Sequence, residues 1–168
     1  DRDVTGVQTC ALPIWKWLNM GELYTIGFTQ KTAKKFFSLL KDNEIDAVVD
    51  IRLNNSSQLA GFSKYPDIGY FLNDLLNIKY IHDPEFSPTA NILKGFKEKK
   101  ISWNEYTKRF NELMAQRNIE QYIQEKYNDC KITKYCLLCS ENEPEQCHRS
   151  LVSDYFCEIY KQLEVINL

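Results

Sequence analysis

Two short clusters in the last third of this sequence hold most of the side chains that could carry chemistry. They are Cys139-Ser140-Glu141 and Cys147-His148-Arg149. A thiol can act as a nucleophile, and a carboxylate or an imidazole can move a proton. A guanidinium can hold a phosphate or a carboxylate through two hydrogen bonds. We therefore take Glu141, Cys139, Cys147 and His148 as candidate catalytic residues and Arg149 as a candidate anion-binding residue.

The spacing of these residues bears on what the thiols could do. A structural zinc ion could use Cys136, Cys139, Cys147 and His148, because Cys-x2-Cys is a finger-like spacing. On one strand, however, positions three apart face opposite sides, so we expect no metal site unless the strand breaks there. A phosphatase loop is not indicated, because Arg149 follows Cys139 by ten positions. A sulfur-transfer or reactive-thiol role stays open.

Short apolar runs alternate with amphipathic stretches along the rest of the chain. The apolar, β-rich runs predict buried strands over 23–27, 45–51, 79–82 and 133–139, with a final strand over 165–168. Helical periodicity predicts helices over 31–41, 70–76, 91–99, 102–127 (with a break near Asn118) and 146–162. This alternation is typical of an α/β protein, and we expect a single-domain, three-layer, Rossmann-like fold with a mainly parallel sheet.

Two helix starts have sequence signals of their own. Ser102 and Glu105 fit a capping box, in which the Ser oxygen takes an amide of the first turn and the Glu reaches back. Pro144 suits the first turn of the last helix. Cys147, His148 and Arg149 then lie near that N-terminus, where free N–H groups and the helix dipole favour an anion or a thiolate.

Polar residues follow each of the first four predicted strands. In an open α/β sheet, ligands bind outside the carboxyl ends of the strands, so these residues are expected to meet. The long polar loop over 53–67 adds several side chains to them. The candidate ligand-binding residues are Gly27, Thr29, Asp50, Arg52, Ser57, His82, Glu85 and Arg149.

Several of these residues also have purely structural interpretations. Asp50 could pair with Arg52, and His82 could be a satisfied buried histidine. The lysines of 31–41 and 94–100 are typical of solvated helix faces, and Tyr106 is typical of a core residue. Cys136 and Cys157 fit a core in the same way, because a free cysteine behaves there as a small hydrophobe.

Composition narrows the class of protein. The chain has 168 residues, 43% of them hydrophobic, with 21 basic and 23 acidic side chains and a net charge of −2. No overall field attracts nucleic acid, although a local basic patch could still bind it. We find neither an apolar run of about 20 residues nor a secretory signal, and we expect a cytoplasmic protein without a membrane partner. Its six cysteines are then expected to be thiols in a reducing compartment.

The first residues do not fit the rest. Residues 1–15 show no periodicity and resemble a translated sequencing-adaptor read-through. We therefore expect residues 1–19 to be a non-native or disordered head, and residues 20–168 to form one α/β domain.

A set of short motifs resembles the family called domain of unknown function 488. The motifs are Tyr24-Thr25-Ile26-Gly27, Asp50-Ile51-Arg52, Tyr80-Ile81-His82 with Pro84-Glu85, Leu138-Cys139-Ser140-Glu141, and Cys147-His148-Arg149. The resemblance covers about residues 23–168. It departs at Phe86-Ser87, where Leu-Gly is usual, and over 50–64, where other members carry a Pro-rich stretch with Arg. It implies a small α/β cytosolic protein, mostly prokaryotic, and no established reaction.

These observations favour an enzyme that acts on a phosphorylated or nucleotide-like ligand. In this hypothesis Arg52 and Arg149 hold the anion, Glu141 is the general acid or base with a histidine assisting, and Cys139 or Cys147 is the nucleophile. One alternative is a non-catalytic module that binds a nucleotide or a nucleic acid. Another is a metal-stabilised structural protein. The residues point to no particular cofactor.

Overall fold

The computed structural model describes residues 21–56, 60–127 and 132–168. The predicted head, Ser57, Gln58, Cys10 and Cys130 therefore lie outside the described residues. None of the described helices is long and apolar enough to cross a membrane. The helices are α1 (Ala33–Asp42), α2 (Asp67–Tyr70), α3 (Ala90–Lys97), α4 (Trp103–Gln116), α5 (Ile119–Lys126) and α6 (His148–Ile159). The strands are β1 (Glu22–Gly27), β2 (Ala47–Asp50), β3 (Lys79–His82), β4 (Tyr135–Cys139) and β5 (Glu164–Asn167).

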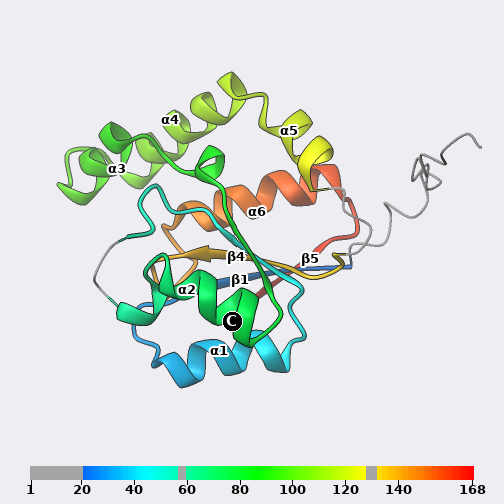
Figure 1. Ribbon diagram of the computed structural model, residues 1–168. Helices are drawn as coiled ribbons and strands as arrows, with labels where there is room; N and C mark the ends of the chain where they lie inside the picture. The colour runs from blue at the N-terminus through cyan, green and yellow to red at the C-terminus, as the bar shows by residue number, and fades with distance from the viewer. Residues whose placement is uncertain (1–20, 57–59, 128–131) are drawn as a thin grey trace, which may run out of the picture.

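The five strands form one parallel sheet in the order β3-β2-β4-β1-β5. β4 lies between β1 and β2, so that Leu23 and Ala47 both pair with Tyr135. The chain moves one way across the sheet from β1 to β3 and then turns back through β4 to β5. Right-handed crossovers in opposite directions place the helices on both faces of the sheet. The predicted three-layer α/β fold is confirmed (Figure 1).

Each face of the sheet has its own hydrophobic cluster. On one face, α1 and α2 cover the sheet through buried residues such as Phe36, Leu40 and Ile68. On the other face, α4, α5 and α6 cover it through residues such as Phe110, Ile123 and Phe156. Because β4 is interior, its side chains alternate between the two clusters, and all five of its residues are buried.

Capping residues explain where several helices begin. Thr32 caps α1, Thr89 caps α3 and Ser102 caps α4, each accepting a hydrogen bond from an amide of the first turn. The predicted capping box is only half present, because the Glu105 carboxylate accepts a hydrogen bond from Arg109 instead of reaching back. The predicted break near Asn118 is confirmed: this residue has φ = 50° and separates α4 from α5.

The last helix starts later than its sequence indicates. α6 begins at His148, whereas helix was predicted from Gln146. Pro144 belongs to a preceding turn, in which its carbonyl accepts the Cys147 N–H, so it does not lie in the first helical turn. Gln146 has φ = 56°, a left-handed conformation that cannot continue into a helix. Cys147 becomes the N-cap residue of α6.

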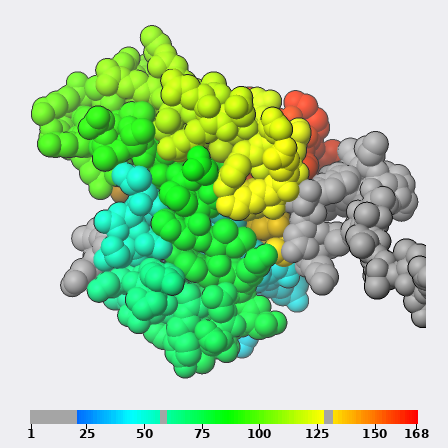
Figure 2. All heavy atoms as spheres, turned by 45° about the horizontal axis from the view of Figure 1, so that its top comes forward, coloured from blue at the N-terminus to red at the C-terminus, as the bar shows by residue number. Residues whose placement is uncertain are grey.

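The long connection between β3 and β4 carries α3, α4 and α5. Figure 2 shows these helices as a continuous ridge, green to yellow, above the segments that follow β2 and β3. The aromatic rings of Phe96, Trp103 and Tyr106 join α3 to α4, with centroids 5.0–5.5 Å apart. This ridge brings residues of α3 close to the loops at the carboxyl end of the sheet.

Candidate functional site: a thiol and imidazole cluster at the end of β4

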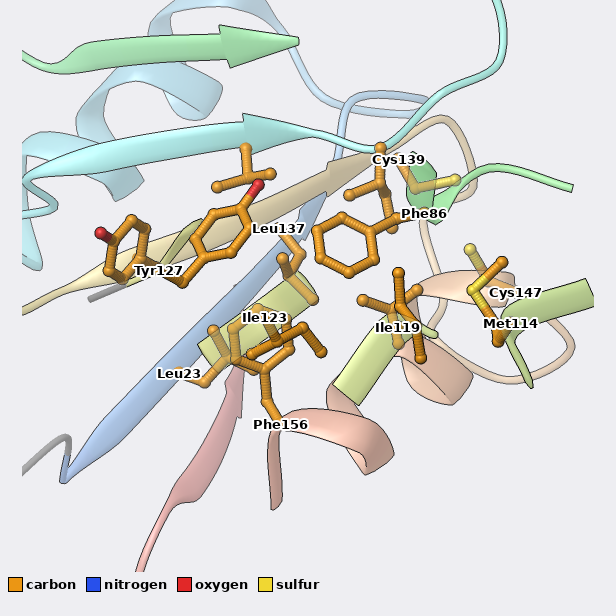
Figure 3. Close-up of a cluster of buried hydrophobic side chains, with 14 of the residues drawn as sticks. Leu23, Phe86, Met114, Ile119, Ile123, Tyr127, Leu137, Cys139, Cys147 and Phe156 are labelled. Carbon is orange, nitrogen blue, oxygen red and sulfur yellow. The ribbon is translucent and has the colours of Figure 1, made fainter. Parts of the chain in front are cut away.

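Cys139, Cys147 and His148 meet where β4 ends and α6 begins. Cys139 is the last residue of β4, Cys147 is the N-cap of α6, and His148 is the first helical residue. The Cys139 Sγ lies 3.6 Å from His148 Nδ1, and one ligand atom from each of the three residues lies within 4.8 Å of the others. Figure 3 shows Cys139 and Cys147 together at one end of a large apolar cluster.

The His148 ring is held by a backbone carbonyl. Its Nε2 lies 3.0 Å from the oxygen of Ile51, the residue that follows β2. A carbonyl oxygen can only accept a hydrogen bond, so Nε2 carries the proton and donates. Nδ1, the nitrogen near Cys139, is therefore the one that is free to accept or bind in the neutral ring.

Contacts within the cluster make the two thiols unequal. Hydrogen bonding from Cys147, together with the charge and hydrogen bond of His148 and the Ser140 N–H, lowers the pKa of Cys139 well below its usual value, although burial opposes this. Hydrogen bonding to Cys139 and burial raise the pKa of Cys147. Burial alone would lower the pKa of His148, but the neighbouring Cys139 raises it overall. Cys139 is thus the more acidic thiol.

The cluster forms part of the wall of a cavity of about 830 Å³. This volume lies within the range of roughly 300–1,000 Å³ that is usual for small-molecule sites. The wall comes from the segments that follow β1 and β2, from the end of β4 and the loop after it, from the start of α6, and from α3, the segment after it and α4. The residues of the wall that could contact a ligand through polar or ionisable groups are Thr29, Gln30, Arg52, Asn54, Lys97, Lys99, Tyr106, Cys139, Ser140, Glu141, Asn142, Glu143, Glu145, Gln146, Cys147 and His148.

Arg52 reaches this wall from a buried ion pair. Its Nε and Nη2 donate to the two oxygens of Asp50 at 2.7 and 2.6 Å, and Nη2 also donates to the Ser63 carbonyl. Tyr80 donates its hydroxyl proton to the same carboxylate at 2.6 Å. The remaining nitrogen, Nη1, is buried and has no hydrogen-bond partner among the described residues. Asp50 therefore positions Arg52, and one donor group of Arg52 is left without a protein partner among the described residues.

Gly27 and Arg149 hold the loop after β4: Gly27 packs against the Glu141 backbone so closely that a β-carbon would overlap it. Arg149 donates from Nη1 to the Glu141 carbonyl and from Nη2 to the Asn142 carbonyl, the latter at 2.8 Å. Its side chain is only 1% exposed. The Thr29 N–H and hydroxyl both donate to the Ser140 carbonyl, at 3.1 and 2.8 Å. Arg149 therefore donates to the chain itself, and its anion contact stays a prediction. Gly27 and Arg149 together position the loop that carries Glu141.

Not all of the predicted residues come together at the cavity. Cys139, Cys147, His148, Glu141, Thr29 and Arg52 all line it. His82 is exposed at the end of the edge strand β3, where its Nε2 lies 2.9 Å from the Arg52 carbonyl. Glu85 is exposed as well and pairs with Arg117 at 3.5 Å. Both lie outside the wall formed by the described residues, because β3 is the last strand on its side of the sheet.

Cys136 is separated from the cluster by the sheet itself. It belongs to the hydrophobic cluster on the α1 and α2 face, whereas Cys139 belongs to the cluster on the α6 face. Burial raises the pKa of the Cys136 thiol. The four-ligand zinc site considered from the sequence therefore does not form, because strand alternation places its first cysteine on the wrong side.

Lys97, Lys99 and Tyr106 are among the wall residues that were not predicted to belong to the site. Lys97 and Lys99 are exposed at the cavity rim, although their sequence pattern is typical of a solvated helix. Tyr106 is buried, as predicted for a core residue, yet it also lines the cavity. Their presence depends on how the β3–β4 connection folds back over the sheet, and no local pattern in the sequence signals this.

The arrangement allows two kinds of chemistry at one place. A thiolate beside an imidazole can attack an electrophile, and two thiols with an imidazole can bind a soft metal ion. The same cavity has cations on the α3 side and carboxylates on the loop after β4.

Comparison with known proteins places the chain in a family. The family described as "Domain of unknown function DUF488" matches residues 32–156, which include the thiol and imidazole cluster. Separate searches of curated proteins and of solved structures gave no match. The family match covers well over half of the sequence, and the chain belongs to the DUF488 family.

Proposed function

We propose that this protein is an enzyme that acts on a phosphorylated or nucleotide-like ligand in the cavity beside β4 and α6. The observation that carries the proposal is the meeting of Cys139, Cys147 and His148 in the wall of a cavity large enough for such a ligand. Reactive side chains from two separate elements that converge on one cavity are what catalytic sites require. We assign Glu141, at the rim, as the group that exchanges a proton with the ligand.

The distribution of charge around the cavity supports a ligand with both an anionic and a polar end. Lys97 and Lys99 lie at the rim on the α3 side, and the Arg52 side chain, held by Asp50, forms part of the wall. Glu141, Glu143 and Glu145 lie on the loop after β4. A phosphate fits the cationic side, and the hydroxyl or amino groups of a sugar or base fit the carboxylates. A long nucleic acid fits less well, because the acidic loop shares the same rim.

A ligand screen with a matched pair of variants tests the binding step. Nucleotides and sugar phosphates are screened by thermal shift, since a ligand at 100 times its Kd stabilises by about 2.7 kcal/mol. The double variant Lys97→Ala/Lys99→Ala is expected to weaken the binding of a hit at least several-fold. The control is Lys94→Ala/Lys100→Ala, which makes the same charge change at two lysines paired with Glu98. Equal effects of the two variants would show that the anion does not bind at this rim.

The catalytic step needs its own measurement. Each hit is incubated with the protein and analysed for chemical change, with Cys139→Ser as the variant expected to bind the ligand and lose turnover. A hit that binds at the rim and is recovered unchanged under all conditions would contradict catalysis and favour the non-catalytic binding module. The thiols call for a reducing compartment, and the cytoplasm is the location we propose for this activity.

A further inference from the structure

Cys139, Cys147 and His148 form a set of ligands suited to a soft divalent metal. Thiolate and imidazole together select zinc among the common divalent ions, whereas calcium and magnesium prefer oxygen ligands. All three residues are buried, with exposed fractions of 4%, 2% and 8%. Their sulfur and nitrogen atoms pair with one another, and His148 Nε2 pairs with the Ile51 carbonyl.

The spacing of the ligand atoms fits one tetrahedral ion. Bonds of about 2.3 Å to sulfur and about 2.0 Å to nitrogen hold two ligand atoms roughly 3.5–3.8 Å apart. Cys139 Sγ and His148 Nδ1 are 3.6 Å apart, within this range. The largest separation in the set is no more than 4.8 Å. Side-chain movements of about 1 Å, together with a turn of the His148 ring that aims Nδ1 between the two sulfur atoms, would close the site around a metal.

The orientation of His148 is the second independent feature. Its Nε2 donates to the Ile51 carbonyl at 3.0 Å, which leaves Nδ1 free to bind a metal, and Nδ1 is the ring nitrogen nearer to Cys139 Sγ, at 3.6 Å against 4.0 Å for Nε2. A histidine that binds a metal through one nitrogen usually donates from the other to a carbonyl or carboxylate, which fixes its tautomer. Ile51 thus supplies the outer contact that such a site needs.

The geometry points to a zinc site formed by Cys139, Cys147 and His148, with its fourth position open to the cavity. Three protein ligands are typical of a catalytic zinc ion, and a closed structural site would need four. Cys136 cannot supply the fourth ligand, because its thiol lies on the other face of the sheet. All three ligands line the cavity, so the fourth position takes an oxygen atom from water or from the bound ligand.

This inference depends on the proposed function only for the use of the fourth position, because zinc binding can be measured without any ligand. Two thiolates and a neutral imidazole carry a charge of −2, which a divalent ion offsets. A zinc ion in this place would polarise the oxygen it binds and place it near Glu141. Zinc binding without any hit in the ligand screen would leave the site standing and overturn the proposed function. A ligand found by the screen for a protein that binds no zinc would support the proposed function and overturn the zinc site.

Elemental analysis of the full chain is the first test. The protein, expressed with added zinc and freed of loosely bound metal, is expected to contain about one zinc ion per chain. Cys147→Ser is expected to lose most of this zinc. The matched control is Cys157→Ser, at a half-buried cysteine near the C-terminal end of α6, and it is expected to keep the zinc. Zinc content near zero in the wild type would overturn the site, and so would equal content in the wild type and Cys147→Ser.

A second measurement on the wild type alone covers the case in which Cys147→Ser does not fold. Thiol alkylation is mapped by mass spectrometry with and without a zinc chelator. Zinc is expected to protect Cys139 and Cys147 at least tenfold and to leave Cys157 unchanged. Cobalt in place of zinc is expected to give the absorption band of a thiolate–cobalt bond. Unprotected thiols at Cys139 and Cys147, or a disulfide between them in the protein as isolated, would overturn the site.

Discussion

Gly27, at the end of β1, touches the backbone of Glu141. A β-carbon at this position would overlap the Glu141 carbonyl oxygen and would come within 2.7 Å of Arg149 Nη1. A side chain at this place cannot be accommodated by rotating a neighbouring side chain, because the obstacle is the backbone of the loop that carries the proposed catalytic carboxylate. The absence of a side chain at Gly27 thus allows this loop to pack directly against the end of β1.

Gly27→Ala is therefore expected to displace the loop after β4. We expect a loss of about 3 kcal/mol in the free energy of unfolding, at the upper end of the range for overpacking, measured by urea denaturation. The control is Gly61→Ala, whose added β-carbon meets nothing within 4 Å. Equal stability of Gly27→Ala and the wild type would contradict the close approach of the two segments.

Arg149→Lys separates a positioning role from a ligand contact. A lysine ammonium cannot span the two carbonyls that the Arg149 guanidinium joins, so we expect a loss of about 1–3 kcal/mol. Hydrogen exchange of the amides of residues 140–146 is expected to accelerate. A variant that loses ligand affinity with unchanged stability and unchanged exchange would return Arg149 to the anion-binding role expected from its sequence.

The buried pair of Asp50 and Arg52 is expected to dominate stability at the end of β2. Asp50→Asn leaves the Arg52 charge without its partner, and we expect a loss of about 3–5 kcal/mol. Tyr80→Phe removes one hydrogen bond to the same carboxylate and should cost about 1 kcal/mol. The exposed pair of Lys94 and Glu98 is the control, since Glu98→Gln should change stability by less than about 0.5 kcal/mol. Similar losses for Asp50→Asn and Glu98→Gln in urea denaturation would contradict this ranking.

Asp46 gives an expected dependence of stability on pH. Burial alone would raise the pKa of Asp46, but the N–H groups of Thr133 and Lys134 and the Thr133 hydroxyl lower it below 3.8 overall. A carboxyl with a lowered native pKa stabilises fully above its unfolded pKa and loses this effect as the pH falls through the native pKa. Asp46→Ala should therefore cost about 1 kcal/mol at pH 7, and the difference from the wild type should shrink below pH 4. A difference independent of pH would contradict the role of the charge.

Glu141→Gln tests the proposed proton transfer. We expect kcat to fall by a factor of roughly 10²–10⁴ on a substrate found by the ligand screen, with KM little changed. Glu143→Gln is the control, because that carboxylate lies on the same rim and accepts a hydrogen bond from Asn142. Equal effects of the two changes on kcat would indicate that the charge of the loop matters and not proton exchange at Glu141.

The sequence predicted the elements well because their signals are local. Apolar runs predicted β1 to β4, and the break predicted near Asn118 is where the structure separates α4 from α5. The meeting of Cys139, Cys147 and His148 could also be foreseen, because a strand end and the next helix start are joined by a short loop. These predictions needed no knowledge of how distant segments pack.

The partners of each side chain could not be read from the sequence in the same way. Arg149 is equally able to bind a ligand or two nearby carbonyls, and only the path of the loop decides between them. His82 and Glu85 follow a strand, as ligand-binding residues often do, but the order of strands leaves β3 at the edge. Lys97 reaches the cavity because α3 folds back over the sheet. All three outcomes depend on tertiary contacts.

The position of β4 between β1 and β2 has a consequence for how the chain acquires its structure. Leu23 of β1 and Ala47 of β2 both pair with Tyr135 of β4, which the ribosome adds to the chain long after them. Until then both strands have an unpaired edge, and such non-local pairing makes folding slow and exposes the chain to aggregation. The pairing of β4 with β1 and β2 also places Cys139, the last residue of β4, at the carboxyl edge of the sheet where the cluster forms. Newly made chains thus gain this cluster only after β4 has paired between β1 and β2 and α6 has formed.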